Sequence, residues 1–338
     1  MITPDPMKGL YICLAVAAAT IMWACGNSSP NSSDKTARPT VKNVIIDADT
    51  DNEVDDLIAI MGAMKADEAG ELDIIGLTAV QWDGRNDTLP EGKPSGWNSR
   101  SAYTSWLMNN IMAQMLGRPD LPLLKGSDKK IVYKKGSNDN EGRPCEAADF
   151  IIAKAKELPD GEKLTIISTG ALTNVAAALM QDSTIADRIA VYWLGQTYDA
   201  ENENRWIGEY EFNVSNDLDA FDLLCDTEDL EFHIMPTNVS YVLWFKTAHS
   251  IDQLETLGSA GKFTADRWLQ WMGGDKSSGR IIWDLAMIYA ITNPELATQT
   301  KVMTPDWCTQ REIDLYTSID APKMRAKFWE SMGCPDEQ

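Results

Sequence analysis

Short apolar runs rich in β-branched residues alternate with amphipathic stretches along most of this chain, and this alternation limits the fold more than any other feature. Strand-like runs such as Val44–Ile46, Ile74–Val80 and Leu164–Ile167 are each followed by residues with helical spacing. Such alternation is typical of a parallel or mostly parallel sheet flanked by helices. We therefore expect an open α/β sheet in a single domain over residues 41–338. Further strands are expected at Ile189–Leu194 and Glu231–Met235, and helices at Leu57–Lys65, Ser101–Leu116, Ala147–Glu157, Leu172–Met180, Asp217–Leu224 and Trp283–Ile291.

The charge of the chain narrows the class of partner. The formal net charge is −21 over 338 residues. Such a surface repels nucleic acid and anionic membranes, and it lacks the basic patch that either partner needs. Small molecules and cations remain as expected ligands.

The first residues have the features of a secretory signal. Lys8 precedes an apolar run over residues 10–23 that is shorter than the roughly 20 residues of a membrane-spanning helix. The run ends before Cys25 in a pattern that resembles a bacterial lipobox, and a Ser-, Asn- and Pro-rich segment follows. We expect a signal peptide over 1–24, a lipidated Cys25 and a flexible tether over 25–40. The protein is then extracytoplasmic, on the periplasmic or cell-surface face, and reaches the membrane through its lipid anchor alone.

The sequence contains few histidines and cysteines that could serve in catalysis or metal binding. The two histidines are His233 and His249, too few and too separate to indicate a Ser-His-Asp or Cys-His mechanism. The cysteines beyond Cys25 have no metal-ligand spacing. These cysteines are Cys145, Cys225, Cys308 and Cys334. We expect them to behave as small buried hydrophobic residues, although an oxidising compartment permits one or two disulfides.

The densest chemical signal is an acidic run directly after the first expected strand. Residues 47–56 contain five aspartates and one glutamate. So many carboxylates repel one another unless a hard cation neutralises them, and oxygen ligands suit Ca²⁺ or Mg²⁺. An EF-hand is excluded, because its sixth position is Asn52 rather than Gly and its twelfth is Ile58 rather than Glu.

This acidic run resembles the Asp-x-Asp-Pro-Gly-x-Asp-Asp loop of the calcium-dependent nucleoside hydrolases. It lacks the Pro-Gly pair and carries two extra residues if Asp47 directly follows the strand. In that register, which we favour, the resemblance implies that Asp49 and Asp56 are metal ligands. The alternative register takes Asp51 in place of Asp49.

A second segment, Leu164–Ala176, is similar to the family's strand-Thr-Gly-x-Leu-Thr-Asn segment. The resemblance implies that the main-chain carbonyl of Thr169 binds the metal.

A third segment, Glu209–Val214, looks like the family's Glu-Phe-Asn segment, whose Glu and Asn hold ribose hydroxyls. Glu211 and Asn213 inherit those roles. Their i, i+2 spacing predicts that both side chains lie on one side of an extended strand. Asn202 or Asn204 is expected to add a further hydroxyl contact.

A fourth segment, Ser278–Ala286, followed by Asn293–Leu296, resembles the family's His-Asp-Pro helix start and its later Asp-Pro-Glu. Asp284 is then the last calcium ligand. Trp283 stands where purine-cleaving members carry histidine, and it can stack on a base but cannot donate a proton usefully.

Together these segments resemble the inosine-uridine-preferring nucleoside hydrolases, which implies a Rossmann-like core and Ca²⁺-dependent hydrolysis of the N-glycosidic bond of a ribonucleoside or ribose-like glycoside. In this mechanism Asp49 takes a proton from the attacking water, and Asp55, Glu211, Asn213 and Trp283 bind substrate. A homo-oligomer is left open.

Three alternatives belong to other classes. The first is a catalytically reduced lipoprotein that binds a nucleoside or sugar. The second is a Mg²⁺-dependent phosphatase of the haloacid dehalogenase type, which also begins with a strand and Asp-x-Asp. The third is an acidic adhesion or scaffold domain.

Overall fold

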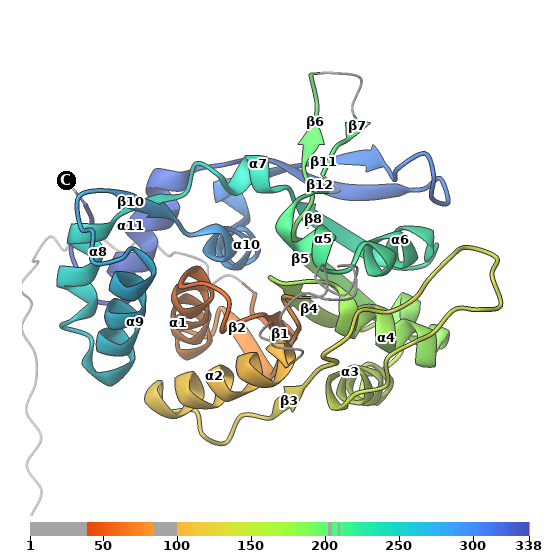
Figure 1. Cartoon of the computed structure of the whole chain (residues 1–338), viewed down its shortest axis with the longest axis horizontal. Helices are drawn as coiled ribbons and strands as arrows, with labels where there is room; N and C mark the ends of the chain where they lie inside the picture. The colour runs from red at the N-terminus through yellow and green to blue at the C-terminus, as the bar shows by residue number, and fades with distance from the viewer. Residues whose placement is uncertain (1–38, 84–99, 202–204, 209, 338) are drawn as a thin grey trace, which may run out of the picture. The chain divides into compact units, whose positions relative to one another are not determined.

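An eight-stranded sheet runs through the protein (Figure 1). The computed structural model describes residues 39–83, 100–201, 205–208 and 210–337, and the chain from Pro39 onward forms one compact unit. The β11–β12 pair is antiparallel, and all other neighbouring strands of this sheet are parallel. The strands follow the order β11 (Ala297–Met303), β12 (Glu312–Ile319), β8 (Glu231–Met235), β5 (Ile189–Leu194), β4 (Leu164–Ser168), β1 (Val41–Ala48), β2 (Leu72–Ala79) and β3 (Leu123–Lys125).

The central strand β1 explains why the sheet is covered on both faces. Val44 and Ile46 belong to one buried hydrophobic cluster, and Ile45 between them belongs to a second cluster on the opposite face. Successive side chains of a strand point to opposite faces, so a continuous apolar run needs helices on each side.

The helices divide between these two faces (Figure 1). Residues of α1, α10 and α11 build the first cluster, and residues of α3, α4 and α6 build the second. The helices are α1 (Asp55–Glu68), α2 (Ser101–Met115), α3 (Glu146–Glu157), α4 (Thr173–Gln181), α5 (Phe212–Asn216), α6 (Leu218–Asp226), α7 (Thr237–Ser240), α8 (Thr247–Leu254), α9 (Gly258–Trp271), α10 (Trp283–Thr292) and α11 (Ala321–Ser331).

Two small antiparallel pairs lie outside the main sheet. One pairs β9 (Trp244–Lys246) with β10 (Gly279–Ile281), and the other pairs β6 (Tyr198–Asp199) with β7 (Arg205–Trp206). Within the described residues, none of the helices combines the length and the apolar character needed to cross a bilayer.

The predicted open, mostly parallel α/β sheet is confirmed. The sequence did not indicate the antiparallel pair β11–β12 at the sheet edge. The expected signal peptide, the lipidated Cys25, most of the tether, and Asn202 and Asn204 lie outside the described residues.

Candidate active site

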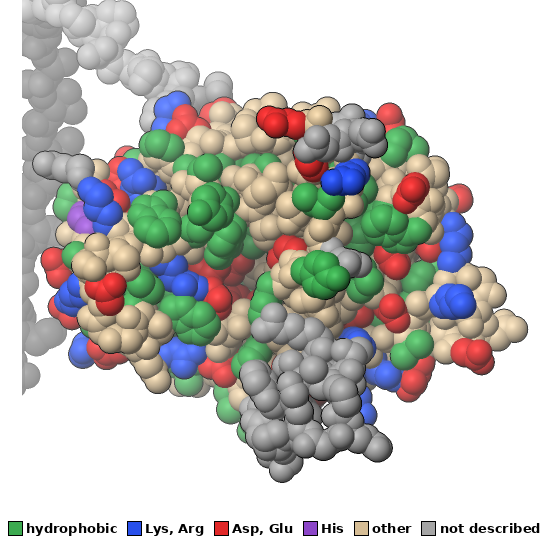
Figure 2. Space-filling view, turned by 45° about the horizontal axis from the view of Figure 1, so that its top comes forward, with side chains coloured by type: hydrophobic (Ala, Val, Ile, Leu, Met, Phe, Trp, Pro, Cys, Tyr) green, Lys and Arg blue, Asp and Glu red, His purple; other side chains and the backbone are tan. Residues whose placement is uncertain are grey.

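The candidate site lies beyond the carboxyl ends of the central strands. Asp49 follows β1, Thr169 follows β4, Leu194 ends β5 and Thr237 follows β8 at its carboxyl end. In open α/β sheets this edge is where ligands bind. These residues line a cavity of about 320 Å³, and Figure 2 shows acidic side chains inside a hollow on one face of the molecule. The cavity holds all eight residues that the sequence indicated for metal, catalysis or substrate: Asp49, Asp55, Asp56, Thr169, Glu211, Asn213, Trp283 and Asp284.

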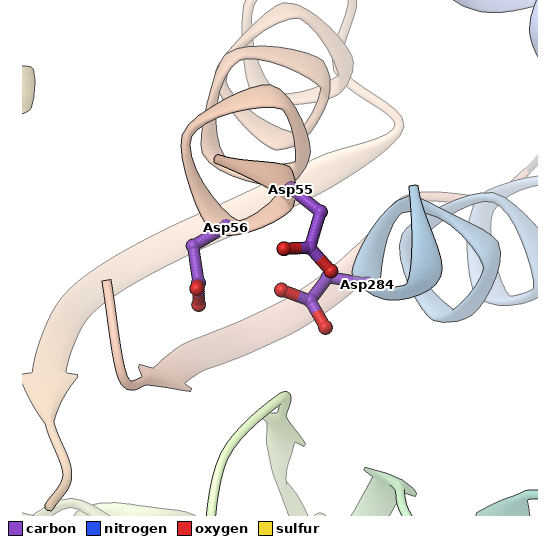
Figure 3. Close-up of side chains that lie close together, drawn as sticks. All are labelled: Asp55, Asp56 and Asp284. Atoms are coloured by element: carbon purple, nitrogen blue, oxygen red, sulfur yellow. The ribbon is translucent and has the colours of Figure 1, made fainter. Parts of the chain in front are cut away.

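Three of these carboxylates converge from two helix starts. Asp55 and Asp56 lie in the first turn of α1, and Asp284 lies in the first turn of α10. One oxygen from each lies within 4.8 Å of the others, and Figure 3 shows the carboxyl groups of Asp55 and Asp284 facing each other with that of Asp56 beside them. The main-chain N–H of Trp283 donates a hydrogen bond to the Asp55 carboxylate, which ties the two helix starts together. The positive end of each helix dipole favours negative charge here.

Asp49 adjoins this trio. Its carboxyl group is hydrogen-bonded to that of Asp56. Gly170 permits this position, because a Cβ at Gly170 would lie 2.5 Å from Val80 Cγ1 and 3.0 Å from Asp49 Oδ1. The Thr-Gly pair after β4 therefore makes room for the aspartate that follows β1.

The two neighbouring aspartates of the acidic run have other partners. Asp47 is fully buried and accepts hydrogen bonds from Thr78 Oγ1 at 2.7 Å and Asn174 Nδ2 at 2.8 Å. Asp51 pairs with Arg267, with 3.1 Å between Asp51 Oδ1 and the guanidinium. The cavity lining includes Asp49 but neither Asp47 nor Asp51, which favours Asp49 over the Asp51 register.

Burial dominates the electrostatics of the cluster. It raises the pKa of Asp49 to about 7 and that of Asp55 to about 7, and nearby carboxylates add to both shifts. Burial and the neighbouring carboxylates raise the pKa of Asp56 and Asp284 well above the usual range. Without a counter-charge the cluster therefore retains protons near neutral pH, although the helix dipoles favour the ionised carboxylates.

The residues present fit a hard cation. Asp49 Oδ2 and Asp56 Oδ1 are buried, and neither has a hydrogen-bond partner among the described residues. Buried carboxylate oxygens of this kind are costly unless a cation or a proton satisfies them. With Asp55, Asp284 and the Thr169 carbonyl nearby, the donor set consists of oxygen atoms, as Ca²⁺ and Mg²⁺ prefer.

The side-chain amide of Asn213 is anchored to the ends of two strands. Its Nδ2 donates to the Thr169 carbonyl at 2.9 Å and to the Leu194 carbonyl at 2.8 Å. Both amide hydrogens are used in this way. Asn213 therefore meets a ligand through its Oδ1, as a hydrogen-bond acceptor.

The prediction that Glu211 and Asn213 lie on an extended strand is wrong. Glu211 is the N-cap of α5, and its Oε2 accepts from the main-chain N–H of Val214 at 3.0 Å and of Gln196 at 2.9 Å. Burial raises the pKa of Glu211. Both side chains still reach the cavity, because they belong to the start of a helix whose N-terminal end faces it.

An aromatic wall lies beside the acidic trio. Trp283 lines the cavity, and its ring lies 5.8 Å from that of Tyr241, which is 62% exposed. Trp283 thus adds an apolar side to the carboxylate-rich cavity, and Tyr241 extends the aromatic surface next to it.

Five lining residues were missed in the sequence. Thr237 and Leu194 could have been found from the rule that ligands meet the carboxyl ends of strands. Asn52 and Glu53 belong to the acidic run but were assigned no role, and Phe212 carried no separate signal.

An open α/β sheet with a carboxylate-rich cavity at its strand ends is an arrangement typical of enzymes that act on small molecules. The chain belongs to the inosine-uridine preferring nucleoside hydrolase family, whose model matches residues 44–323. It is therefore an N-ribosyl hydrolase, and the family's reaction is hydrolysis of the N-glycosidic bond of nucleosides. This membership removes the phosphatase and scaffold alternatives.

Individual relatives agree with this assignment. The chain is 25% identical over 250 residues to probable uridine nucleosidase 2 of Oryza sativa subsp. japonica, a match that covers 68% of this chain and 66% of the relative. It is 24% identical over 301 residues to uridine nucleosidase 1 of Arabidopsis thaliana, with 82% of each covered. The solved structure of a plant nucleoside hydrolase superposes with a TM-score of 0.61 at 20% identity, covering 88% of this chain and 100% of the other, which supports the fold.

Proposed function

We propose that this protein hydrolyses the N-glycosidic bond of a ribonucleoside with Ca²⁺ bound at Asp49, Asp56, Asp284 and the Thr169 carbonyl. The observation that carries the proposal is the convergence of carboxylates from the starts of α1 and α10 inside a cavity that also contains Glu211 and Asn213. Asp55 belongs to the same trio, which supports a role for it beside the ion in addition to its contact with a substrate hydroxyl.

Calcium suits this donor set better than magnesium. Ca²⁺ accepts six to eight oxygen ligands in flexible geometry and readily takes main-chain carbonyls, whereas Mg²⁺ demands a near-octahedral shell and keeps several waters. When bound, the ion supplies a template for vicinal hydroxyls and lowers the pKa of water.

The chain's own residues divide the remaining tasks. Asp49 removes a proton from the water that attacks the anomeric carbon. Asn213 Oδ1 and Glu211 accept hydrogen bonds from ribose hydroxyls, and the carboxylates stabilise positive charge as the glycosidic bond breaks. Trp283 and Tyr241 offer an apolar surface to the departing base.

Uridine is the first substrate to test, because the relatives from Oryza sativa and Arabidopsis thaliana carry uridine nucleosidase names. Purified protein with Ca²⁺ is incubated with uridine, inosine, cytidine and a ribose phosphate ester, and free ribose is measured. Ribose release from at least one nucleoside, with none from the ester, is the expected result. Retained nucleoside binding without turnover would instead favour a binding lipoprotein.

We also propose that the protein is an extracytoplasmic lipoprotein anchored at Cys25, with a signal peptide over 1–24, a tether over 25–40 and the catalytic domain over 41–338. The lipobox-like sequence before Cys25 supports this proposal.

A further inference from the structure

Two cysteines that are distant in the sequence meet on the face of the sheet that carries α6. Cys225 lies in the last turns of α6, and Cys308 lies in the connection between β11 and β12. Both are free thiols, and the Cys308 side chain is near enough to the Cys225 thiol to raise its pKa. Cys225 is 0% exposed and Cys308 is 6% exposed, and both belong to the same hydrophobic cluster.

Further contacts between the neighbouring residues keep the two thiols close together. Trp307 Nε1 donates to Asp222 Oδ1 at 2.9 Å, and Cys308 Sγ lies 3.7 Å from the same oxygen. The main-chain N–H of Thr309 donates to Asp226 Oδ1 at 2.5 Å. Residues on both sides of Cys308 are thus fixed to the helix turns on both sides of Cys225.

Arg311 adds a third attachment. Its guanidinium donates to the main-chain carbonyls of Cys225 at 3.1 Å, Leu224 at 2.9 Å and Leu230 at 2.9 Å. These carbonyls lie at and beyond the C-terminal end of α6. The segment that carries Cys308 therefore has little freedom to move away from Cys225.

The other two described cysteines have different surroundings. Cys145 Sγ lies 3.7 Å from Asn174 Oδ1, and Cys334 Sγ lies 3.8 Å from the Met332 carbonyl. Within the described residues, the contacts therefore single out Cys225 and Cys308 as a pair.

We propose that Cys225 and Cys308 form a structural disulfide when the chain folds in the presence of a small-molecule disulfide or an oxidised disulfide oxidoreductase. The thiolate of one cysteine attacks the oxidant's disulfide, and one thiolate leaves. The second cysteine then attacks the mixed disulfide and releases the other. The two cysteines lose two electrons and two protons in total, and the oxidant is reduced to two thiols that take up those protons.

The bond forms during folding rather than afterwards. Burial raises the pKa of the Cys225 thiol well above its usual range, so the folded reduced protein offers little thiolate to an oxidant. Once formed, the bond joins α6 to the β11–β12 connection and closes a long loop, which restricts the unfolded chain. It fixes the helix that directly follows α5, whose N-cap is Glu211.

The test compares full-length protein refolded in a glutathione redox buffer with protein refolded in reductant. Peptide mapping without reduction should find a cross-link between the peptides that contain Cys225 and Cys308. The oxidised protein should melt roughly 5–10 °C above the reduced protein. Cys225→Ser and Cys308→Ser should each abolish this difference, and the matched control Cys334→Ser should retain it.

Three results would overturn the proposal. One is alkylation of both Cys225 and Cys308 in the denatured oxidised protein. Another is a cross-link from either residue to Cys145 or Cys334. The third is a Cys225–Cys308 cross-link with equal melting temperatures for oxidised and reduced protein, which contradicts the stabilising role. The peptide map of the unmodified protein decides the pairing even if a serine variant fails to fold.

Discussion

The carboxyl groups of Asp56 and Asp284 are hydrogen-bonded to each other across the first turns of α1 and α10. Two carboxyl groups can share such a bond when one of them holds a proton. A divalent cation would replace that proton and satisfy both groups. The contact therefore links the packing of two helices to the affinity of the site for metal.

Protons and metal compete for the same carboxylates. We therefore predict that the stability of the metal-free protein falls as pH rises, whereas its affinity for Ca²⁺ increases. Burial raises the pKa of Asp49 and Asp55 from 3.8 to about 7. The folded metal-free protein thus binds more protons than the unfolded chain between about pH 4 and 7, so its stability falls as pH rises through this window. Ca²⁺ needs the ionised groups, so its affinity rises with pH.

Thermal melts in chelator should show this as a lower melting temperature at about pH 8 than at about pH 5, and Ca²⁺ should raise the value most at the higher pH. Asp56→Asn removes one of the titrating groups and should flatten both trends. A chelated wild type that gains stability from about pH 5 to pH 8 would contradict this account.

Asp49→Asn should lower kcat/KM by roughly 10²–10⁴-fold, because the amide keeps the shape of the side chain but cannot accept the proton of water. The fold should be retained, since the amide has the size of the carboxyl group and can still hydrogen-bond to Asp56. Asp51→Asn is the matched control, because Asp51 pairs with Arg267 outside the cavity. Equal losses in the two variants would show that Asp49 has no special role.

The aromatic wall predicts a preference for good leaving groups. Trp283 and Tyr241 can stack on a base, but Trp283 does not supply a useful proton to a departing purine. Nitrophenyl riboside should therefore show a higher kcat/KM than inosine in steady-state assays. If inosine is cleaved equally fast, another residue protonates the base.

The lipobox-like sequence predicts attachment through Cys25. Full-length protein expressed in a bacterial host should fractionate with membranes, and Cys25→Ala should release it or block its processing. A Cys334→Ser variant should behave as the unmodified protein. Unchanged membrane attachment of Cys25→Ala would refute the lipid anchor.

Much of the site could be predicted because strand ends converge in parallel sheets. Asp49, Thr169 and Asp284 each occur next to a recognisable local pattern, and the topology brings them to one edge. The direction of the Asp55 side chain depends on how α10 packs against α1, which is a long-range contact. The sequence therefore predicts only a substrate-binding role for Asp55, whereas in the structure Asp55 belongs to the acidic trio.

Other errors have local causes. Glu211 and Asn213 were expected on a strand because i, i+2 spacing was interpreted as extended, but the Glu211 carboxylate caps a helix that begins at the next residue. The sequence does not indicate the edge strand β11, because most of its side chains are exposed and it lacks the apolar run of the central strands. Its position comes from pairing with β12 rather than from its own composition.

The most direct test of the central claim is a Ca²⁺ titration of chelator-treated protein, in which ribose release from the preferred nucleoside is followed together with calorimetry. Wild type should regain activity as about one ion binds per chain, and Asp56→Asn should bind weakly and stay inactive. Hydrolysis by the chelated wild type at the full rate, or full activity of Asp56→Asn, would contradict the account.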